Sequence, residues 1–371
     1  MDPLAQFCHN PDCPARGQPA SGNIRIHSRK ERRYLCSTCG RTFAATRDTP
    51  FYRLKKSLDL VTIVVTLLCH GCPVQAVVAA FGLDERTVAD GRDRSGRHGQ
   101  LLHEHRILRG QVEFGDVQAD ELYVKAVGRR LWMAMAMAVP SRLWLGGVVS
   151  QRRDLALITA VVTMVRRAAK SMAFLVCVDG LASYVTAFVR VFRDPVRTGR
   201  RGRPKLRAIP GLLLGQVVKH HRGRRLVDVT RRVVLGPAGA IAGVLSATGT
   251  GTGINTSYIE RLNATFRSSL CPLVRRGRAI VRGEAVLTGW MYLVGCAYNF
   301  CWEHDSLRVA AGPEGRLMWS ERTPAMAAGL TDHVWTMHEL LSQPIPLPNW
   351  VAPRRRGRPP KRLQATELVP A

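Results

Sequence analysis

The stretch FLVCVDGLASY, residues 174–184, begins with five apolar residues and reaches an aspartate, Asp179, directly after them. A strand that is apolar on both faces is typical of a sheet covered by helices, so this run predicts a buried strand. A carboxylate fixed at the end of such a strand differs from an ordinary surface charge. The stretch therefore predicts the fold class, α/β, together with a candidate functional residue.

The chain on either side of this stretch supports the α/β prediction. Residues 131–139 (LWMAMAMAV) and 143–150 (LWLGGVVS) are expected to be strands around the turn PSR, and a helix is expected over 155–170. After the basic link RTGRRGRPKLR, residues 197–207, a hairpin is expected over 215–234. Strands that alternate with helices in this way are typical of an α/β domain.

A second carboxylate lies near the end of another strand-like run. Asp120 stands in VQADELYV, where Asp116 and Glu121 compete with it for a functional role. Since side chains alternate along a strand, we expect Glu121 to point away from Asp120. Asp120 and Asp179 are therefore the two strand-end aspartates of the predicted sheet.

Residues 256–270, TSYIERLNATFRSSL, are predicted to form an amphipathic helix, because apolar residues recur at three- and four-residue steps. Glu260, Asn263 and Arg267 then share one face. Taken alone, Glu260 reads as a solvated surface charge. Together with the two strand-end aspartates it would complete a site for two Mg²⁺ or Mn²⁺ ions, which suits phosphodiester chemistry. Asn263 and Arg267 would contact the rim of this site or the DNA backbone.

The net charge indicates the class of partner. The 371 residues include 55 Lys and Arg against 27 Asp and Glu, a formal net charge of +28. Because the basic residues are spread along the chain, nucleic acid is favoured over a membrane surface. The apolar runs are too short to span a bilayer, and the N-terminal residues MDPLAQFCHN lack the regions of a signal peptide. We expect a cytoplasmic protein whose cysteines are thiols or metal ligands.

Two closely spaced pairs of cysteines stand near the start of the chain: Cys8 with Cys13, and Cys36 with Cys39. Such pairs supply four soft ligands from two turns, the pattern of a structural zinc ribbon. Four unrelated buried thiols are the alternative. Cys69 and Cys72 have no second pair nearby, so packing is favoured over metal binding there.

Residues 72–99, CPVQAVVAAFGLDERTVADGRDRSGRHG, resemble a helix-turn-helix. The turn is expected at Gly82, with Asp84 as the N-cap of the second helix and Val88 packing against the first. A plain helical hairpin is the alternative, and Gly91 in the second helix counts in its favour. The second helix would present three arginines to DNA: Arg86, Arg92 and Arg94.

Two basic segments contain the tripeptide Gly-Arg-Pro, at residues 202–204 and 357–359. They resemble the AT-hook core, which lies in a narrow A·T minor groove of DNA. Arg203 and Arg358 are then candidate DNA contacts. An ordinary solvated basic linker is the alternative.

With these motifs together, the chain resembles bacterial insertion-sequence transposases of the DDE type. The most specific pieces are CHNPDCPARG with RRYLCSTCGRTF, ADELYV, VDGLASY and YIERLNATFR. The last keeps the Glu-x6-Lys/Arg relation of this superfamily through Glu260 and Arg267. The resemblance implies an RNase H-like catalytic domain, with Asp120, Asp179 and Glu260 as its triad. The long gap between Asp179 and Glu260 implies an inserted hairpin.

The implied layout has four parts: a zinc ribbon over 1–50, a helix-turn-helix over 51–105, an RNase H-like domain over 106–345 with a basic insertion at about 195–255, and a basic disordered tail over 346–371. The implied function is that of a DNA transposase. It would bind the inverted ends of its element and cleave phosphodiester bonds, then transfer 3′-OH strands to target DNA with two Mg²⁺ ions.

The resemblance also implies a structural Zn²⁺ ion, double-stranded DNA as partner, and a homodimer or larger assembly on that DNA, associated with the bacterial nucleoid. Two alternatives belong to other classes. One is a non-catalytic, sequence-specific DNA-binding protein derived from a transposase. The other is a metal-dependent DNA nuclease that shares the same carboxylates.

Overall fold

The computed structural model describes residues 1–196, 199, 203–223, 225–274, 277, 279–312 and 318–352. The described chain divides into two compact units, one made of residues 1–45 with residues 346–352 and the other of residues 46–345. The segment expected as a helix-turn-helix, residues 51–105, belongs to the larger of these two units. Arg358 and most of the expected tail over 346–371 lie outside the described residues.

The smaller unit contains a three-stranded antiparallel sheet: β1 (Ile24–Ser28), β2 (Arg33–Cys36) and β3 (Thr42–Ala44). Tyr34 and Phe43 form its small core together with the buried cysteines. Because little apolar surface is available in a unit of this size, we expect it to need further stabilisation from a bound metal.

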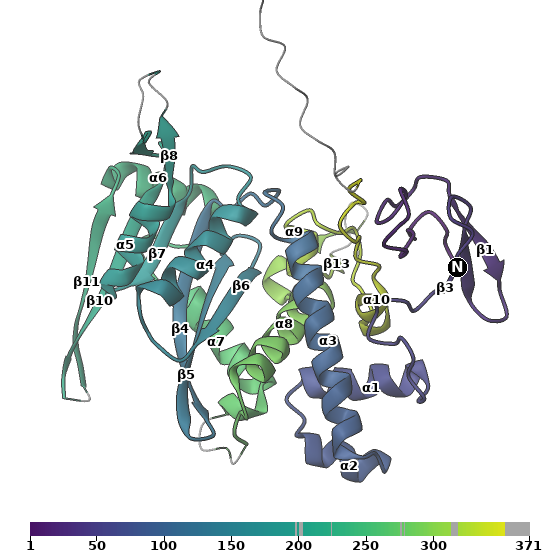
Figure 1. Cartoon of the computed structure of the whole chain (residues 1–371). Coiled ribbons are helices and arrows are strands. Elements are labelled where there is room, and N and C mark those ends of the chain that lie inside the picture. The colour runs from purple at the N-terminus through teal and green to yellow at the C-terminus, as the bar shows by residue number, and fades with distance from the viewer. Residues whose placement is uncertain are drawn as a thin grey trace, which may run out of the picture. The chain divides into compact units, whose positions relative to one another are not determined.

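The larger unit contains a six-stranded mixed sheet in the order β11-β10-β7-β4-β5-β6 (Figure 1). Its strands are β4 (Asp116–Ala126), β5 (Arg129–Ala138), β6 (Leu143–Ser150), β7 (Leu175–Asp179), β10 (Leu213–Arg222) and β11 (Arg225–Leu235). β4, β5 and β6 form an antiparallel meander, β7 runs parallel to β4 and β10, and β11 returns antiparallel to β10. The predicted strands and the predicted hairpin are confirmed.

Helices flank this sheet on both faces (Figure 1). They are α4 (Leu155–Ala168), α5 (Ala182–Val191), α6 (Ala238–Thr248), α7 (Ser257–Ser269) and α8 (Glu284–Phe300). α4 and α5 share a core with Val117 and Ala119 of β4, whereas α7 packs with Leu122 and Val124. The α/β class is confirmed.

Three further helices precede the sheet: α1 (Leu58–Cys69), α2 (Val74–Phe81) and α3 (Glu85–Arg106). Gly82 ends α2 with a φ of 58°, and the Asp84 side chain accepts a hydrogen bond from the backbone N–H of Arg86 at 2.8 Å. Val88 is buried in the core between these helices. The predicted turn is therefore confirmed, but α3 continues for 22 residues into the core of the larger unit.

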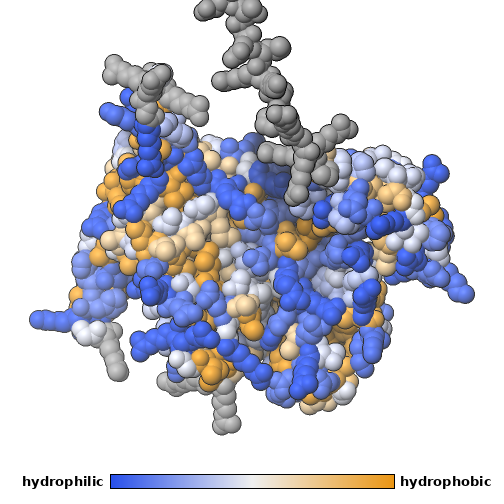
Figure 2. Space-filling view, in the orientation of Figure 1, coloured by the Kyte–Doolittle hydropathy of each residue, from blue (hydrophilic) through white to orange (hydrophobic). Residues whose placement is uncertain are grey.

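The remaining elements are short: β8 (Arg193–Val196), β9 (Lys205–Ala208), η1 (Cys271–Leu273), η2 (Asp305–Leu307), β12 (Val309–Ala310), β13 (Trp319–Ser320), α9 (Pro324–Ala327) and α10 (Met337–Ser342). β10 pairs with β7 only over residues 213–217, so the hairpin projects beyond the sheet. Its projecting end is hydrophilic (Figure 2). Among the described helices, none has the length and apolar character needed to cross a bilayer.

α3 and α8 approach each other closely at glycines. A Cβ atom added to Gly96 would lie 2.5 Å from the backbone carbonyl oxygen of Gly289. We expect Gly96→Ala to lower the free energy of unfolding by about 2 kcal/mol, because the two helices must move apart. Gly91 in the same helix is the control, since an added Cβ meets nothing within 4 Å. There alanine should stabilise by about 0.5–1 kcal/mol. Equal urea midpoints for the two variants would contradict this reading.

Candidate active site

Strand register brings the two predicted aspartates together. β4 and β7 are parallel, and Ala119 lies opposite Val178. The next residue on each strand is an aspartate, so Asp120 and Asp179 stand side by side where β7 ends. The expectation that Asp120 lies near the end of its own strand was wrong, because β4 continues to Ala126. Carboxylate oxygens of Asp120, Glu121 and Asp179 lie within 4.8 Å of one another. This acidic cluster can hold a metal ion.

The acidic cluster opens into a cleft of about 750 Å³ to which α7 contributes one wall. Glu260, Asn263 and Arg267 all line this cleft, as expected for residues on one helical face. The Asn263 side-chain amide donates a hydrogen bond of 2.7 Å to Oδ2 of Asp120. Asn263 is 1 % exposed, so this bond fixes the Asp120 carboxylate from a buried position.

Gln118 holds the start of α7 on the sheet. Its Oε1 accepts hydrogen bonds from the backbone N–H groups of Tyr258 and Ile259, both at 3.1 Å. These groups belong to the first turn of the helix, where backbone donors lack partners within the helix. Gln118 also lies two residues before Asp120, so both side chains leave the same face of β4. One strand, β4, therefore carries both Gln118, which positions α7, and Asp120, which faces the cleft.

Glu260 lies in the same cleft but has other partners. Its Oε1 accepts hydrogen bonds from Nζ of Lys219 at 2.5 Å and from Oγ1 of Thr256 at 2.9 Å. Within the described residues, the close acidic cluster does not include Glu260. The structure therefore brings the predicted triad to one cleft, with the glutamate held by a lysine from the projecting hairpin.

Glu121 departs from the prediction. Its side chain faces the α4 and α5 layer, where Tyr184 donates a hydrogen bond of 2.9 Å and Arg153 Nε one of 2.6 Å. Its carboxylate nevertheless belongs to the acidic cluster with those of Asp120 and Asp179. The Glu121 side chain thus leaves the opposite face of β4 from Asp120, as expected, but its carboxylate stays close to that of Asp120, which was not expected. Asp116, the other competitor, is fully buried and outside the acidic cluster.

The negative charges of the site are crowded. Burial, and then the charges of Glu121, Asp179 and Glu260, raise the pKa of Asp120 to about 7. Arg153 approaches Asp179 only to 3.8 Å, through Nη2 and Oδ2. A divalent cation would relieve this repulsion, and hard carboxylate oxygens are the ligands that Mg²⁺ prefers. The donor set thus fits a hard metal ion.

A raised pKa predicts that protons compete with metal at this site. We expect Mn²⁺ affinity, measured by isothermal titration calorimetry, to fall by up to about tenfold between about pH 8 and about pH 6, as Asp120 takes up a proton. In the metal-free protein, Asp120 should lower stability as pH rises from its ordinary pKa of 3.8 to about 7, because the carboxyl then loses its proton in the unfolded chain but keeps it in the folded protein.

The control for this prediction is Asp116→Asn. Burial also raises the pKa of Asp116 to about 7, but Asp116 lies outside the acidic cluster. Its replacement should leave the pH dependence of Mn²⁺ binding unchanged, whereas Asp120→Asn should remove it. A pH dependence that survives Asp120→Asn would assign the proton to another group.

The four cysteines of the smaller unit converge as predicted. The sulfur atoms of Cys8 and Cys39 are 3.6 Å apart and those of Cys13 and Cys36 are 4.0 Å apart. All four sulfurs lie within 4.8 Å of one another. Zinc–sulfur bonds of 2.3 Å in a tetrahedron place sulfurs about 3.8 Å apart, so the arrangement fits a zinc ion. The backbone N–H of Asn10 donates to Cys8 at 3.4 Å.

Removing one of these thiols should empty the cysteine site. We expect Cys36→Ala to weaken zinc binding at least about a hundredfold and to unfold the smaller unit. Metal analysis and limited proteolysis of the full chain would measure both effects. The matched control is Cys72→Ala, a half-buried cysteine outside the cluster. A Cys36→Ala protein that keeps a full equivalent of zinc would contradict the prediction.

The arginines predicted to contact DNA differ in their exposure and in their partners within the protein. Arg86 is exposed at the start of α3. Arg92 instead pairs with Asp93 at 2.8 Å, and its guanidinium lies 5.2 Å from the Trp290 ring. Arg94 donates to Asp90 at 2.7 Å and to the backbone carbonyl of Tyr52 at 3.0 Å. Both are engaged within the fold, since this part of α3 packs inward. Arg203 is exposed just before β9.

Comparisons with known proteins give no family: no family model matches the chain, and no curated protein matches it. What the site can do must be read from its own residues. Four residues of the site were not found in the sequence, namely Gln118, Arg153, Tyr184 and Lys219. Their side chains gave no signal by themselves, because each acts through a partner far away in the chain.

Proposed function

We propose that this protein is a DNA transposase of the DDE type. The observation that carries the proposal is the placement of Asp120 and Asp179 side by side in a cleft lined by Glu260. A formal net charge of +28 favours an anionic polymer as the substrate of that cleft. The substrate is double-stranded DNA, namely the ends of the element and the target.

In this proposal Asp120, Asp179 and Glu260 hold two Mg²⁺ or Mn²⁺ ions. Metal ions so placed activate a water or a 3′-hydroxyl and stabilise the leaving oxygen. Asn263 keeps the Asp120 carboxylate directed into the cleft through its 2.7 Å hydrogen bond. Glu260 must exchange Lys219 for metal, which would turn the lysine toward the phosphate of the bound strand.

Other cationic groups complete the cleft. Arg153 and Arg267 line it beside the carboxylates. Their charges attract the phosphodiester backbone, which a site made of carboxylates alone would repel. Positioning and charge of this kind carry most of the catalysis in phosphoryl transfer.

The finer assignments belong to the same proposal. The mixed sheet flanked by helices is compatible with an RNase H-like catalytic domain. The cysteine cluster is assigned to a structural Zn²⁺ ion, and the exposed Arg86 to the DNA-reading end of α3. A homodimer or larger assembly is included because two element ends must be brought together.

One observation favours the non-catalytic alternative. Glu260 is paired with Lys219 at 2.5 Å, and a glutamate committed to that pair would leave the metal site incomplete. A metal-dependent nuclease would use the same residues and differ only in the products that it leaves.

The test is to incubate purified protein, in Mg²⁺ and in EDTA, with DNA that carries the natural flanks of its gene. Nicks at a defined boundary together with joined strands, both requiring metal, are the expected result. Cut ends without joined products would make the protein a nuclease. Specific binding without cutting would leave the DNA-binding alternative.

A further inference from the structure

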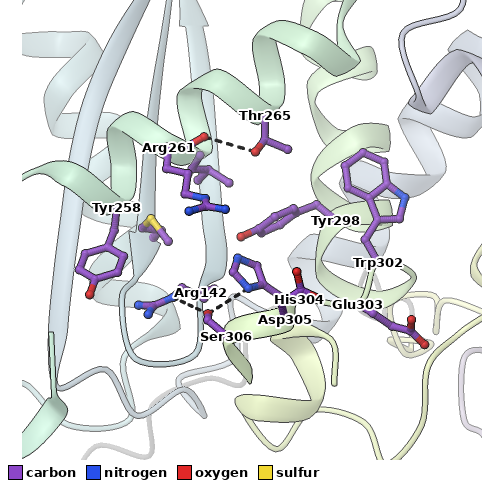
Figure 3. A pocket seen from close by; sticks show the side chains of 12 residues that line it. Arg142, Tyr258, Arg261, Thr265, Tyr298, Trp302, Glu303, His304, Asp305 and Ser306 are labelled. Atoms are coloured by element: carbon purple, nitrogen blue, oxygen red, sulfur yellow. Dashed lines mark hydrogen bonds between the residues drawn. The ribbon is translucent and has the colours of Figure 1, made fainter. Parts of the chain in front are cut away.

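A second cavity, of about 490 Å³, lies beside the face of α7 that carries Arg261 and Thr265 (Figure 3). Arg142, from the turn between β5 and β6, and Tyr298, near the end of α8, line it together with Trp302 and the loop that follows. The volume falls within the roughly 300–1,000 Å³ of small-ligand sites. The cavity uses none of the residues assigned to the metal cleft.

Two arginines reach this cavity, and neither is bound to a carboxylate in the part of the chain that the structure describes. Among the described residues, neither Arg142 nor Arg261 forms an ion pair. Arg142 is held in place, since its guanidinium lies 4.1 Å from the Tyr258 ring centre and its Nε donates to Oγ of Ser306 at 3.4 Å. Figure 3 shows the Arg261 guanidinium directed into the same space.

Burial and the two guanidinium groups together favour the neutral form of the neighbouring histidine. Burial, and then the charges of Arg142 and Arg261, lower the pKa of His304, whose Nδ1 lies 3.0 Å from Ser306 Oγ. Glu303 and Asp305 also line the cavity, and Asp305 opposes this pKa shift, but both carboxylates are exposed to solvent. Two ordered guanidinium groups near a neutral imidazole are suited to a phosphate group.

Aromatic rings form another wall. Tyr298 is 7 % exposed and Trp302 is half-buried, with ring centres 6.2 Å apart and planes at 85°. A planar base can lie against one such ring while its edge meets the other. Arginine and aromatic residues on neighbouring walls are the usual means of holding single-stranded nucleic acid.

We propose that this cavity binds one unpaired nucleotide of the DNA strand, with the phosphate between Arg142 and Arg261 and the base against Tyr298 and Trp302. The proposal deepens the proposed function and rests on it for the choice of DNA as ligand. α7 links the two sites, because Glu260 faces the metal cleft and the next residue, Arg261, faces the cavity. A strand lying across α7 would be held on both sides of the reacting phosphate.

The experiment is photocrosslinking of the full chain, in EDTA, to a single-stranded oligonucleotide containing 5-iododeoxyuridine. Fragmentation mass spectrometry should locate the adduct at Tyr298 or Trp302. Filter binding of the same oligonucleotide measures total DNA binding. If the DNA binds but crosslinks only at other residues, the proposal of a nucleotide site in the cavity is overturned, whereas the proposed transposase function is not. Absence of any DNA binding overturns both proposals.

Variants make the assignment specific. Arg261→Gln should reduce the adduct at Tyr298 or Trp302 about tenfold through loss of a charged hydrogen bond. Arg130→Gln, an exposed arginine of β5 with the same change in charge, should leave it unchanged. Equal losses of adduct in the two variants would show that the effect comes from the lower positive charge of the protein in general. That result would overturn the nucleotide site.

Two further crosslinking measurements distinguish an unpaired strand from a duplex and from a free nucleotide. A fully paired duplex should give several-fold less adduct at these rings, because its bases must first leave the stack. Equal yields from duplex and single strand would overturn the unpaired base. 5-Iododeoxyuridine monophosphate alone should crosslink weakly, and a yield equal to that of the oligonucleotide would overturn the DNA strand in favour of a free nucleotide.

Discussion

Replacing Asp179 by Asn is expected to abolish metal-dependent DNA cleavage while DNA binding and the fold remain intact. The substitution removes a negative charge from the acidic cluster, and a poorly held metal loses several kcal/mol of transition-state stabilisation. That loss corresponds to at least about a thousandfold in rate. The fold should tolerate it, because Oδ1 of an asparagine can still accept the hydrogen bond that Leu181 N–H donates at 3.0 Å. Product mapping on flanking DNA measures the rate.

The control for this prediction is Asp228→Asn, which makes the same change of charge on the exposed strand β11. It should cleave at the rate of the unaltered protein. Cleavage by the Asp179→Asn protein at an undiminished rate would remove Asp179 from the site. Loss of DNA binding together with cleavage would assign it a structural role.

Glu260→Gln and Glu121→Gln are expected to have opposite signatures. Glu260 has a side chain that is 47 % exposed, so glutamine should keep the fold and DNA binding but lose cleavage about a thousandfold. The side chain of Glu121 is 2 % exposed and paired with Arg153, so its replacement should cost about 2 kcal/mol of stability. Thermal unfolding and cleavage assays on both variants separate the two roles.

The reverse result would change the triad. An active Glu260→Gln protein, together with a stable but inactive Glu121→Gln protein, would make Glu121 the third metal ligand beside Asp120 and Asp179. Glu260 would then serve only to hold Lys219. The choice matters because both glutamates come close to the same cleft while each already has protein partners.

The parts of the site that follow from short-range rules could be predicted from the sequence. The apolar run before Asp179 places this aspartate at the end of β7, and a helical period of 3.6 places Glu260 and Asn263 on one face. Closely spaced cysteines such as Cys36 and Cys39 could also be predicted as metal ligands, since both lie in one short turn of the chain.

Contacts between distant segments could not be predicted in this way. The Lys219 pair with Glu260 depends on how far the β10–β11 hairpin extends beyond β7, which no local pattern fixes. The inward position of Arg92 arises because α3 packs on α8, nearly two hundred residues later. A period in the sequence shows which residues share a face, but not what covers that face.

The uninterrupted course of α3 has a consequence for the spacing of recognition and chemistry. Its 22 residues make a rod about 33 Å long, with Arg86 at one end and the packed glycine contact with α8 further along. One continuous helix between these points fixes the distance between them. In the proposed transposase, cutting would then fall at a fixed number of base pairs from the recognised sequence. Bases inserted between that sequence and the original cutting position would leave this number unchanged. The cut would therefore move away from its original position by the number of inserted bases.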